Sequence, residues 1–178
     1  VDAMSFDINS EVAYTELPFL PVRLFKLNHL SSIANKDISK TMISSGTSGQ
    51  QPSKIFLDKE TSLRQTKVLA KIVSEFTGST RSPMIILDSI SVLKNRNMFS
   101  ARGAGIIGFS MFGTKRVYAL KDNMELDIES VGAFVRDHQE SRIFIFGFTF
   151  MIYKHFIKEL QKKKINLDLS NAVLIHGG

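Results

Sequence analysis

The sequence contains no cysteine and no tryptophan among its 178 residues, and only four prolines and four histidines. Without cysteine the chain cannot form disulfide bridges, thiolate metal sites or a cysteine nucleophile. His29, His138 and His155 lack the spacing of metal ligands, so we predict no metal site built from protein side chains. The core must therefore be stabilised by packing alone.

Long apolar runs are also missing. The longest, over residues 143–153, is interrupted by Gly147 and Thr149 and is too short to span a bilayer. The chain does not open with the basic and apolar leader that directs secretion. We therefore expect a cytoplasmic protein without a membrane span.

Basic side chains outnumber acidic ones, 23 against 17, which gives a formal charge of +6. One cluster lies near the end of a predicted helix, where cations complement the helix C-terminus. It consists of Lys154, Lys158, Lys162, Lys163 and Lys164. The chain has no recognised nucleic-acid-binding pattern. We therefore predict no nucleic-acid partner, and a basic nucleic-acid-binding domain is the least favoured of three hypotheses.

Hydrophobic residues make up 43% of the chain, so a chain of this length is expected to fold as one packed domain, residues 1–178. Beyond residue 58, strand-like and helix-like segments alternate, which predicts an α/β fold with a mostly parallel sheet flanked by helices. Ligands bind such sheets at the carboxyl ends of the strands. The expected strands span residues 38–43, 54–57, 84–87, 116–120, 142–146 and 174–175. The expected helices run from Asp58 to about Thr77, over 98–112, from about Asp127, and after Gly147.

Apolar residues at helical spacing predict which helix faces are buried. In the first long helix they are Leu69, Ile72, Val73 and Phe76, and in the helix after Gly147 they are Tyr153, Phe156, Ile157 and Leu160. Gly147 itself is expected to turn the chain out of the preceding strand. Three further glycines are expected to allow close packing of the segment 98–112: Gly103, Gly105 and Gly108.

The most informative segment spans residues 44–54, where hydroxyl side chains and glycines alternate and a lysine follows. Small side chains let several backbone N–H groups point to one spot, which suits a phosphate, and the lysine adds a charge that reaches outer phosphates. It is not a Walker A loop, because Gly49 is not followed by lysine and a hydroxyl residue. A flexible surface turn is the simpler alternative, but the predicted strands on both sides favour a positioned loop. The predicted phosphate-binding residues are Ser44, Ser45, Gly46, Thr47, Ser48, Gly49 and Lys54.

Three further side chains fall where a ligand would bind. His176, at the end of the last strand, is either an active-site contact or a hydrogen-bonded structural residue. Asp88 follows an apolar strand, and capping a turn or helix is its simpler role. Arg102 suits a carboxylate or phosphate, although an ion pair with a nearby acid is the simpler expectation. The spacing predicts no catalytic triad or carboxylate pair, so the sequence identifies no catalytic residue.

These elements together resemble the large subdomain of the adenylate-forming ligases, the superfamily of acyl-CoA synthetases and nonribosomal adenylation domains. Within that superfamily the chain is similar to the acyl-protein synthetases of the bacterial luminescence fatty-acid reductase complex. The resemblance covers most of the chain from about Leu17 onward. It is carried by residues 44–49 with 53–55, by 102–113, by 150–154 and by the closing 175–178.

The resemblance implies a two-step reaction. A fatty acid and Mg-ATP would give an acyl-adenylate and pyrophosphate, and the acyl group would then pass to a thiol. ATP and Mg²⁺ are the implied cofactors, with Lys54 and its loop on the β- and γ-phosphates. Gly177 and Gly178 would lie against the adenine, beside His176. The implied partners are a fatty acid or related carboxylate and the acyl-transferase and reductase subunits of the complex.

The chain reaches Gly178 without the superfamily's acidic magnesium-binding motif, ribose-binding aspartate, hinge or C-terminal lid, and without an acceptor thiol. We therefore expect residues 1–178 to be the N-terminal part of the adenylating large subdomain, inactive by itself, with the C-terminal lid absent. Gln50 and Gln51 also place Pro52 one residue later than the commonest superfamily spacing. The alternative function is a non-catalytic nucleotide-binding or assembly module.

Overall fold

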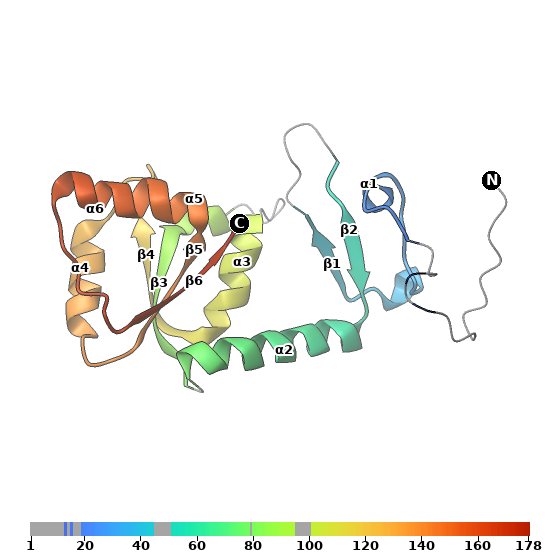
Figure 1. The fold of residues 1–178 in the computed structure, drawn as a ribbon, viewed down its shortest axis with the longest axis horizontal. Helices are drawn as coiled ribbons and strands as arrows, with labels where there is room; N and C mark the ends of the chain where they lie inside the picture. The colour runs from blue at the N-terminus through green and yellow to red at the C-terminus, as the bar shows by residue number, and fades with distance from the viewer. Residues whose placement is uncertain (1–12, 14, 16–18, 45–50, 79, 95–100) are drawn as a thin grey trace.

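The computed structural model describes residues 13, 15, 19–44, 51–78, 80–94 and 101–178. A four-stranded sheet with its helices lies at one end of the molecule and the hairpin β1–β2 at the other, with α2 extending between them (Figure 1). The strands are β1 (Lys40–Ile43), β2 (Lys54–Leu57), β3 (Ser82–Ser89), β4 (Gly113–Leu120), β5 (Ile143–Phe148) and β6 (Ala172–Gly177). The α-helices are α1 (Leu24–Leu27), α2 (Lys59–Thr77), α3 (Ala101–Phe109), α4 (Ile128–Asp137), α5 (Thr149–Met151) and α6 (Lys158–Lys163). Short 3₁₀-helices are η2 (Asn35–Asp37), η3 (Ile90–Leu93) and η4 (Ser110–Phe112), and η5 (Ile152–Ile157) is a π-helix.

The main sheet has the strand order β4-β3-β5-β6, and every neighbouring pair is parallel. This confirms the predicted α/β fold with a parallel sheet flanked by helices. β1 and β2 form a separate antiparallel pair in which Lys40 lies opposite Leu57 and Ile43 opposite Lys54. The sheet order places β3 and β5 at its centre, so their carboxyl ends lie side by side.

Alternate residues of the central strands pack on opposite faces of the sheet. Met84 and Ile86 of β3 join the core beneath α3, whereas Ile85 and Leu87 join the core beneath α4 and the helices that follow β5. On the α3 side, the ring of Phe109 stacks on Phe146 with centroids 4.3 Å apart. Both faces of these central strands are covered, so residues that point to either side are apolar. This explains why their sequences are apolar without alternation.

Side-chain caps determine where two of the helices begin. The Asp58 carboxylate accepts a hydrogen bond from the Thr61 backbone N–H at 2.6 Å, at the start of α2. Asp127 accepts in the same way from the Ser130 N–H at 3.2 Å and begins α4. These bonds satisfy backbone donors that have no partner within the helix, and they confirm both predicted helix starts.

The predicted apolar stripe of α2 is only partly buried. Val73 is 2% exposed and Leu69 is half-buried, but Ile72 and Phe76 are 54% and 61% exposed. The other buried position is the polar Thr77, whose hydroxyl donates to the Val73 carbonyl oxygen at 3.0 Å. The prediction was wrong for Ile72 and Phe76 because only one edge of the helix is covered among the described residues.

The helix that follows β5 also buries a different set of side chains from the predicted one. Met151, Ile152 and Phe156 are buried, whereas Tyr153 and Ile157 are exposed. The π-helix η5 explains the difference, because its wider turn shifts the inward-facing positions away from the regular spacing of 3.6 residues. The prediction for Tyr153 and Ile157 was therefore wrong.

Gly147 does not turn the chain, as the sequence suggested, but lies inside β5 opposite His176 of β6. A Cβ at this position would come within 2.8 Å of the Leu87 Cβ and 3.2 Å of the Ile152 Cγ1. Glycine is required here because Leu87 of the neighbouring strand β3 and Ile152 of η5 both approach the strand closely. Gly105 is similarly close to Phe146, but a Cβ at Gly108 would meet nothing within 4 Å, so the close packing predicted for Gly108 is wrong.

We expect Gly147→Ala to destabilise the fold by about 1–3 kcal/mol, since the added methyl overpacks against a Cβ that cannot move away without shifting β3. Thermal unfolding followed by circular dichroism measures the effect as a fall of several degrees. Gly108→Ala is the matched control, because it adds the same methyl to open space in α3 and raises helix propensity. Equal melting temperatures for the two variants would contradict the close approach at Gly147.

Candidate functional site

The carboxyl edge of the main sheet brings together polar and aromatic residues from separate parts of the chain. β3 ends at Ser89, β5 is followed at once by Thr149, and β6 ends at Gly177. Figure 1 shows the end of β6, marked C, at the edge where α5 begins. Parallel α/β sheets bind ligands at this edge, so we take it as the candidate site.

Asp88 and Arg102 form the central contact of this edge. The Arg102 Nε donates to Asp88 Oδ2 at 2.9 Å, and the Nη2 donates to Oδ1 at 2.6 Å. Oδ1 also accepts from the Ser89 backbone N–H at 2.8 Å. The Asp88 side chain is 2% exposed and that of Arg102 is 30% exposed. The expected ion pair of Arg102 with a nearby acid is therefore confirmed, whereas the cap after β3 is Ser89, whose hydroxyl accepts from the Ser91 N–H, and not Asp88 as the sequence suggested.

The Arg102 guanidinium has a second neighbour in Phe150, whose ring centroid is 5.9 Å from the Arg102 Cζ. Phe150 is 54% exposed, so its ring lies beside the ion pair at the surface.

Burial raises the pKa of Tyr118 above its ordinary value of 10.0, with Arg116 opposing the shift and the Asp88 charge adding to it. Tyr118 is therefore a neutral hydroxyl at physiological pH and not a base.

His176 lies in β6, and its Nδ1 is 2.9 Å from the Thr149 hydroxyl oxygen. The same hydroxyl donates to the carbonyl oxygen of Gly178 at 2.5 Å. The Thr149 hydroxyl thus bridges His176 and the closing residue Gly178. This contact joins the end of β6 to the start of α5, which is the hydrogen-bonded role that was one of the two alternatives for His176.

Phe148 connects two segments that are far apart in the sequence. A Cβ at Gly105 of α3 would lie 3.2 Å from the Phe148 ring, and a Cβ at Gly177 would lie 3.6 Å from it. Gly177 lies beyond the predicted strand 174–175 but belongs to β6, opposite Phe148 of β5. The Phe148 ring thus lies close both to the segment around Gly105 and to the closing Gly177 and Gly178.

The hairpin β1–β2 holds both ends of the predicted phosphate loop. The Ser53 N–H donates to the Ser44 hydroxyl oxygen at 2.9 Å, and the Ser44 N–H donates to the Ser53 carbonyl oxygen at 3.0 Å. Lys54 is exposed directly beside this closure. Both strands that were predicted to flank the loop are therefore present and paired. The predicted residues Ser45, Gly46, Thr47, Ser48 and Gly49 lie outside the described residues.

Sequence reasoning did not select Phe148, Thr149 or Phe150 for this edge. The available signal was their position immediately after the apolar core of β5, since residues that follow a strand of a parallel sheet lie at its carboxyl edge. Their side chains are aromatic or a single hydroxyl, so their chemistry alone did not distinguish them from core or surface residues.

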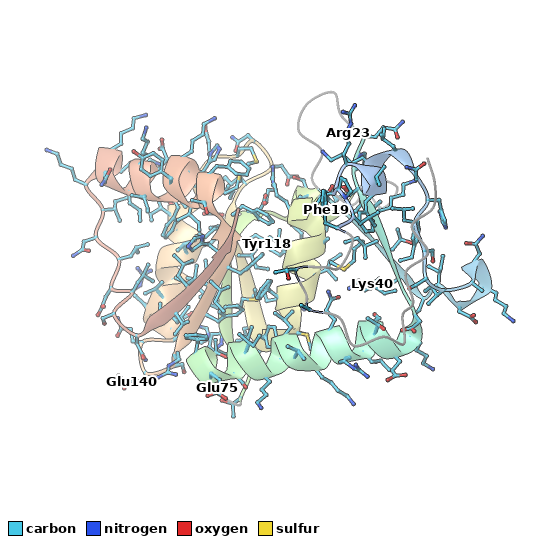
Figure 2. All side chains as sticks on the ribbon, turned by 45° about the vertical axis from the view of Figure 1, so that its right-hand side comes forward. Phe19, Arg23, Lys40, Glu75, Tyr118 and Glu140 are labelled. Atoms are coloured by element: carbon cyan, nitrogen blue, oxygen red, sulfur yellow. The ribbon has the colours of Figure 1, made fainter. Side chains whose placement is uncertain are left out.

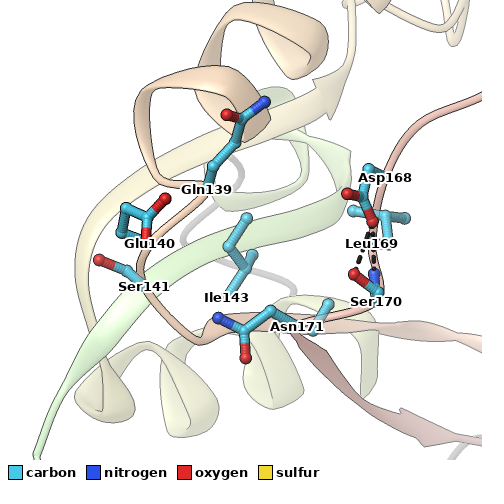
Figure 3. A pocket seen from close by; sticks show the side chains of 9 residues that line it. Gln139, Glu140, Ser141, Ile143, Asp168, Leu169, Ser170 and Asn171 are labelled. Atoms are coloured by element: carbon cyan, nitrogen blue, oxygen red, sulfur yellow. Dashed lines mark hydrogen bonds between the residues drawn. The ribbon is translucent and has the colours of Figure 1, made fainter.

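A polar pocket of about 250 Å³ lies at the opposite, amino edge of the sheet, between the starts of β5 and β6 (Figure 3). Its lining includes Glu140, Ser141, Ile143 and Asp168. The Ser170 hydroxyl donates to Asp168 at 2.6 Å, and this bond lowers the pKa of the Asp168 carboxyl below its ordinary value. The polar groups at Asp168 are thus already paired, and the pocket is distant along the strands from the carboxyl edge.

The described part of the chain contains no group of three or more His, Asp or Glu side chains placed to hold a metal ion. Within the same ranges, no helix has the length and apolar character needed to cross a membrane.

Charged side chains such as Arg23, Lys40, Glu75 and Glu140 are exposed at the surface of the described molecule (Figure 2).

Comparison with known proteins identifies the family. The family described as "Acyl-protein synthetase, LuxE" matches residues 2–178. No curated protein and no solved structure matches the chain. Because the match spans nearly every residue, including the hairpin, α3 and the closing glycines, the chain belongs to the LuxE acyl-protein synthetase family.

Proposed function

We propose that this protein activates a fatty or other carboxylic acid with ATP to an acyl-adenylate and then transfers the acyl group to a protein thiol. Membership of an acyl-protein synthetase family carries the proposal. The paired strands that hold Ser44 and Lys54 at the base of the loop, and the polar carboxyl edge of the sheet, support it.

In the first step a carboxylate oxygen attacks the α-phosphorus and the bond to the β-phosphate oxygen breaks, releasing pyrophosphate. The protein's task is to hold the triphosphate in line and to offset the charge that grows on the leaving group. Lys54 supplies that charge, and loop N–H groups supply donors. Magnesium, which the family generally uses, would bind the ATP phosphates and offset part of their charge.

In the second step the thiol sulfur attacks the acyl carbon, AMP leaves, and the thiol proton passes to solvent or a base. The acceptor thiol lies on another segment or protein, since this chain has no cysteine. We propose the acyl-transferase and reductase subunits of a luminescence-type complex as partners, and residues 1–178 as the N-terminal part of an adenylating subdomain. A lid would complete such a site and exclude water from it.

The adenine is proposed to lie against Gly177 and Gly178. We expect Gly177→Ala to raise the KM for ATP about tenfold or more without a change in melting temperature. The methyl would meet the Phe148 ring at 3.6 Å, which is an ordinary contact, so the fold accepts it, but a flat ring could no longer rest on the backbone. Steady-state kinetics of the full-length protein measure the effect, with Gly108→Ala as control. An unchanged KM would place the adenine elsewhere.

The isolated chain of 178 residues is expected to bind ATP weakly and to turn over no fatty acid, because the ribose and lid contacts of such a site are proposed not to come from it. Titration calorimetry with ATP tests the first statement. Submicromolar affinity would contradict it.

Fatty-acid-dependent exchange of radiolabelled pyrophosphate into ATP, measured on the full-length gene product, tests the proposed function itself. Exchange that needs the acid supports adenylation, since only reversal of the first step returns label to ATP. The alternative, a non-catalytic nucleotide-binding or assembly module, predicts ATP binding without exchange.

A further inference from the structure

The Arg102 guanidinium is held firmly but uses only two of its three nitrogens. Nε and Nη2 both donate to Asp88, and the third nitrogen, Nη1, makes no hydrogen bond to any described residue. The side chain is 30% exposed, so water or a ligand can reach it. Among the described residues, the Nη1 edge of the guanidinium, with two N–H donors, is therefore left without a hydrogen-bond partner at the carboxyl edge of the sheet.

Two contacts fix the direction of this open edge. Asp88 is almost fully buried, and its Oδ1 is itself held by the Ser89 N–H at 2.8 Å. The Phe150 ring lies on another side of the guanidinium, 5.9 Å from Cζ. Burying a charged pair costs solvation free energy that packing of apolar side chains would not. A pair that serves only stability has no need of an exposed donor edge, whereas a binding group does.

We propose that the Nη1 edge of Arg102 binds the carboxylate of the acid substrate, with Asp88 as the residue that positions it; this rests on the proposed function. Guanidinium donors match the geometry of carboxylate oxygens. The Asp88 charge offsets that of Arg102, so the pair attracts a singly charged carboxylate through directed hydrogen bonds and disfavours a multiply charged triphosphate. The exposed Phe150 ring beside it gives an apolar surface for the tail of such an acid.

Binding of octanoate and of octanol to the full-length protein tests this site without requiring adenylation. The two ligands have the same chain length and differ in the carboxylate. The main variant is Asp88→Asn with Arg102→Gln, because it removes both charges together and leaves no buried charge unpaired. We expect octanoate affinity to fall about 10- to 100-fold, the factor for losing a hydrogen bond to a charged group, and octanol affinity to stay unchanged.

Asp88→Asn alone separates binding from a structural role. If the guanidinium binds the carboxylate, this variant keeps octanoate binding, since the amide oxygen of the substituted side chain still accepts one of the two bonds that position Arg102 and the competing negative charge is gone. If the pair is only structural, octanoate and octanol affinity fall together in both variants, which would overturn the proposal.

Loss of inorganic phosphate binding in the double variant with octanoate binding retained would also overturn it, by making Arg102 a phosphate contact. Wild-type octanoate affinity in the double variant would do the same. Absence of pyrophosphate exchange in the wild type, with octanoate binding dependent on Arg102, would instead contradict adenylation and leave the carboxylate site standing.

Discussion

Lys54→Ala is expected to lower fatty-acid-dependent pyrophosphate exchange by the full-length protein about 100- to 1,000-fold. That is the scale for removing one preorganised electrostatic donor from a transition state in which charge develops. Lys54 begins β2, directly opposite Ile43 and next to the Ser44–Ser53 closure, so the strand pair positions its backbone. Thr47→Ala should lower exchange less, because a neutral hydroxyl makes a hydrogen bond about half as strong as a charged one.

Lys40→Ala is the matched control for Lys54→Ala. Lys40 is an exposed lysine of the same hairpin, but it lies opposite Leu57 at the end away from the loop. We expect wild-type exchange for Lys40→Ala and nearly wild-type melting temperatures for both variants, since exposed side chains contribute little to stability. Wild-type exchange by Lys54→Ala would mean that residues 44–54 form only a surface turn.

Arg102→Ala is expected to lower the free energy of unfolding by about 3 kcal/mol. The variant leaves the buried Asp88 carboxylate without its partner, and breaking a buried ion pair costs about 3–5 kcal/mol. We expect the lower end of that range because Arg102 is partly exposed, and water can approach the space it vacates. In a chain of this size the loss corresponds to a fall in melting temperature of about 6–12 °C.

Arg64→Ala provides the control for Arg102→Ala, because Arg64 pairs with Glu60 at 2.8 Å on the exposed surface of α2. Such a pair contributes only a few tenths of a kcal/mol. Adding Asp88→Asn to Arg102→Ala should recover part of the lost stability, since it removes the unpaired charge. Similar melting temperatures for Arg102→Ala and Arg64→Ala would show that the Asp88–Arg102 pair contributes no more than a surface contact.

Local patterns in the sequence were sufficient to predict most elements of the fold. β2 has the predicted bounds. α2 also begins after Asp58 and ends at Thr77 as predicted, because the signals that start and end a helix lie within a few residues of its two ends. The unalternated apolar run at 84–87 correctly indicated a strand covered on both faces. The apolar runs of β3 and β5 and the helices between them likewise implied the parallel sheet.

Predictions failed where a residue's environment depends on distant parts of the chain. Gly147 looked like a turn residue, yet it is a strand residue that Leu87 and Ile152 approach closely. Tyr153 looked inward-facing on a regular helix, but the π-helix turns it outward. Neither difference can be derived from sequence periodicity, since both arise from the way one layer packs on another.

The sequence by itself determined the α/β class, the strand-flanked loop at 44–54 and the family, because each follows from local residue type and order. Only the tertiary structure decided that Asp88 and Arg102 pair, that Thr149 holds His176, and that Gly105 and Gly177 meet at Phe148. These contacts join residues 14 to 43 positions apart, and such pairings are selected by the free energy of packing the whole sheet and not by any local preference.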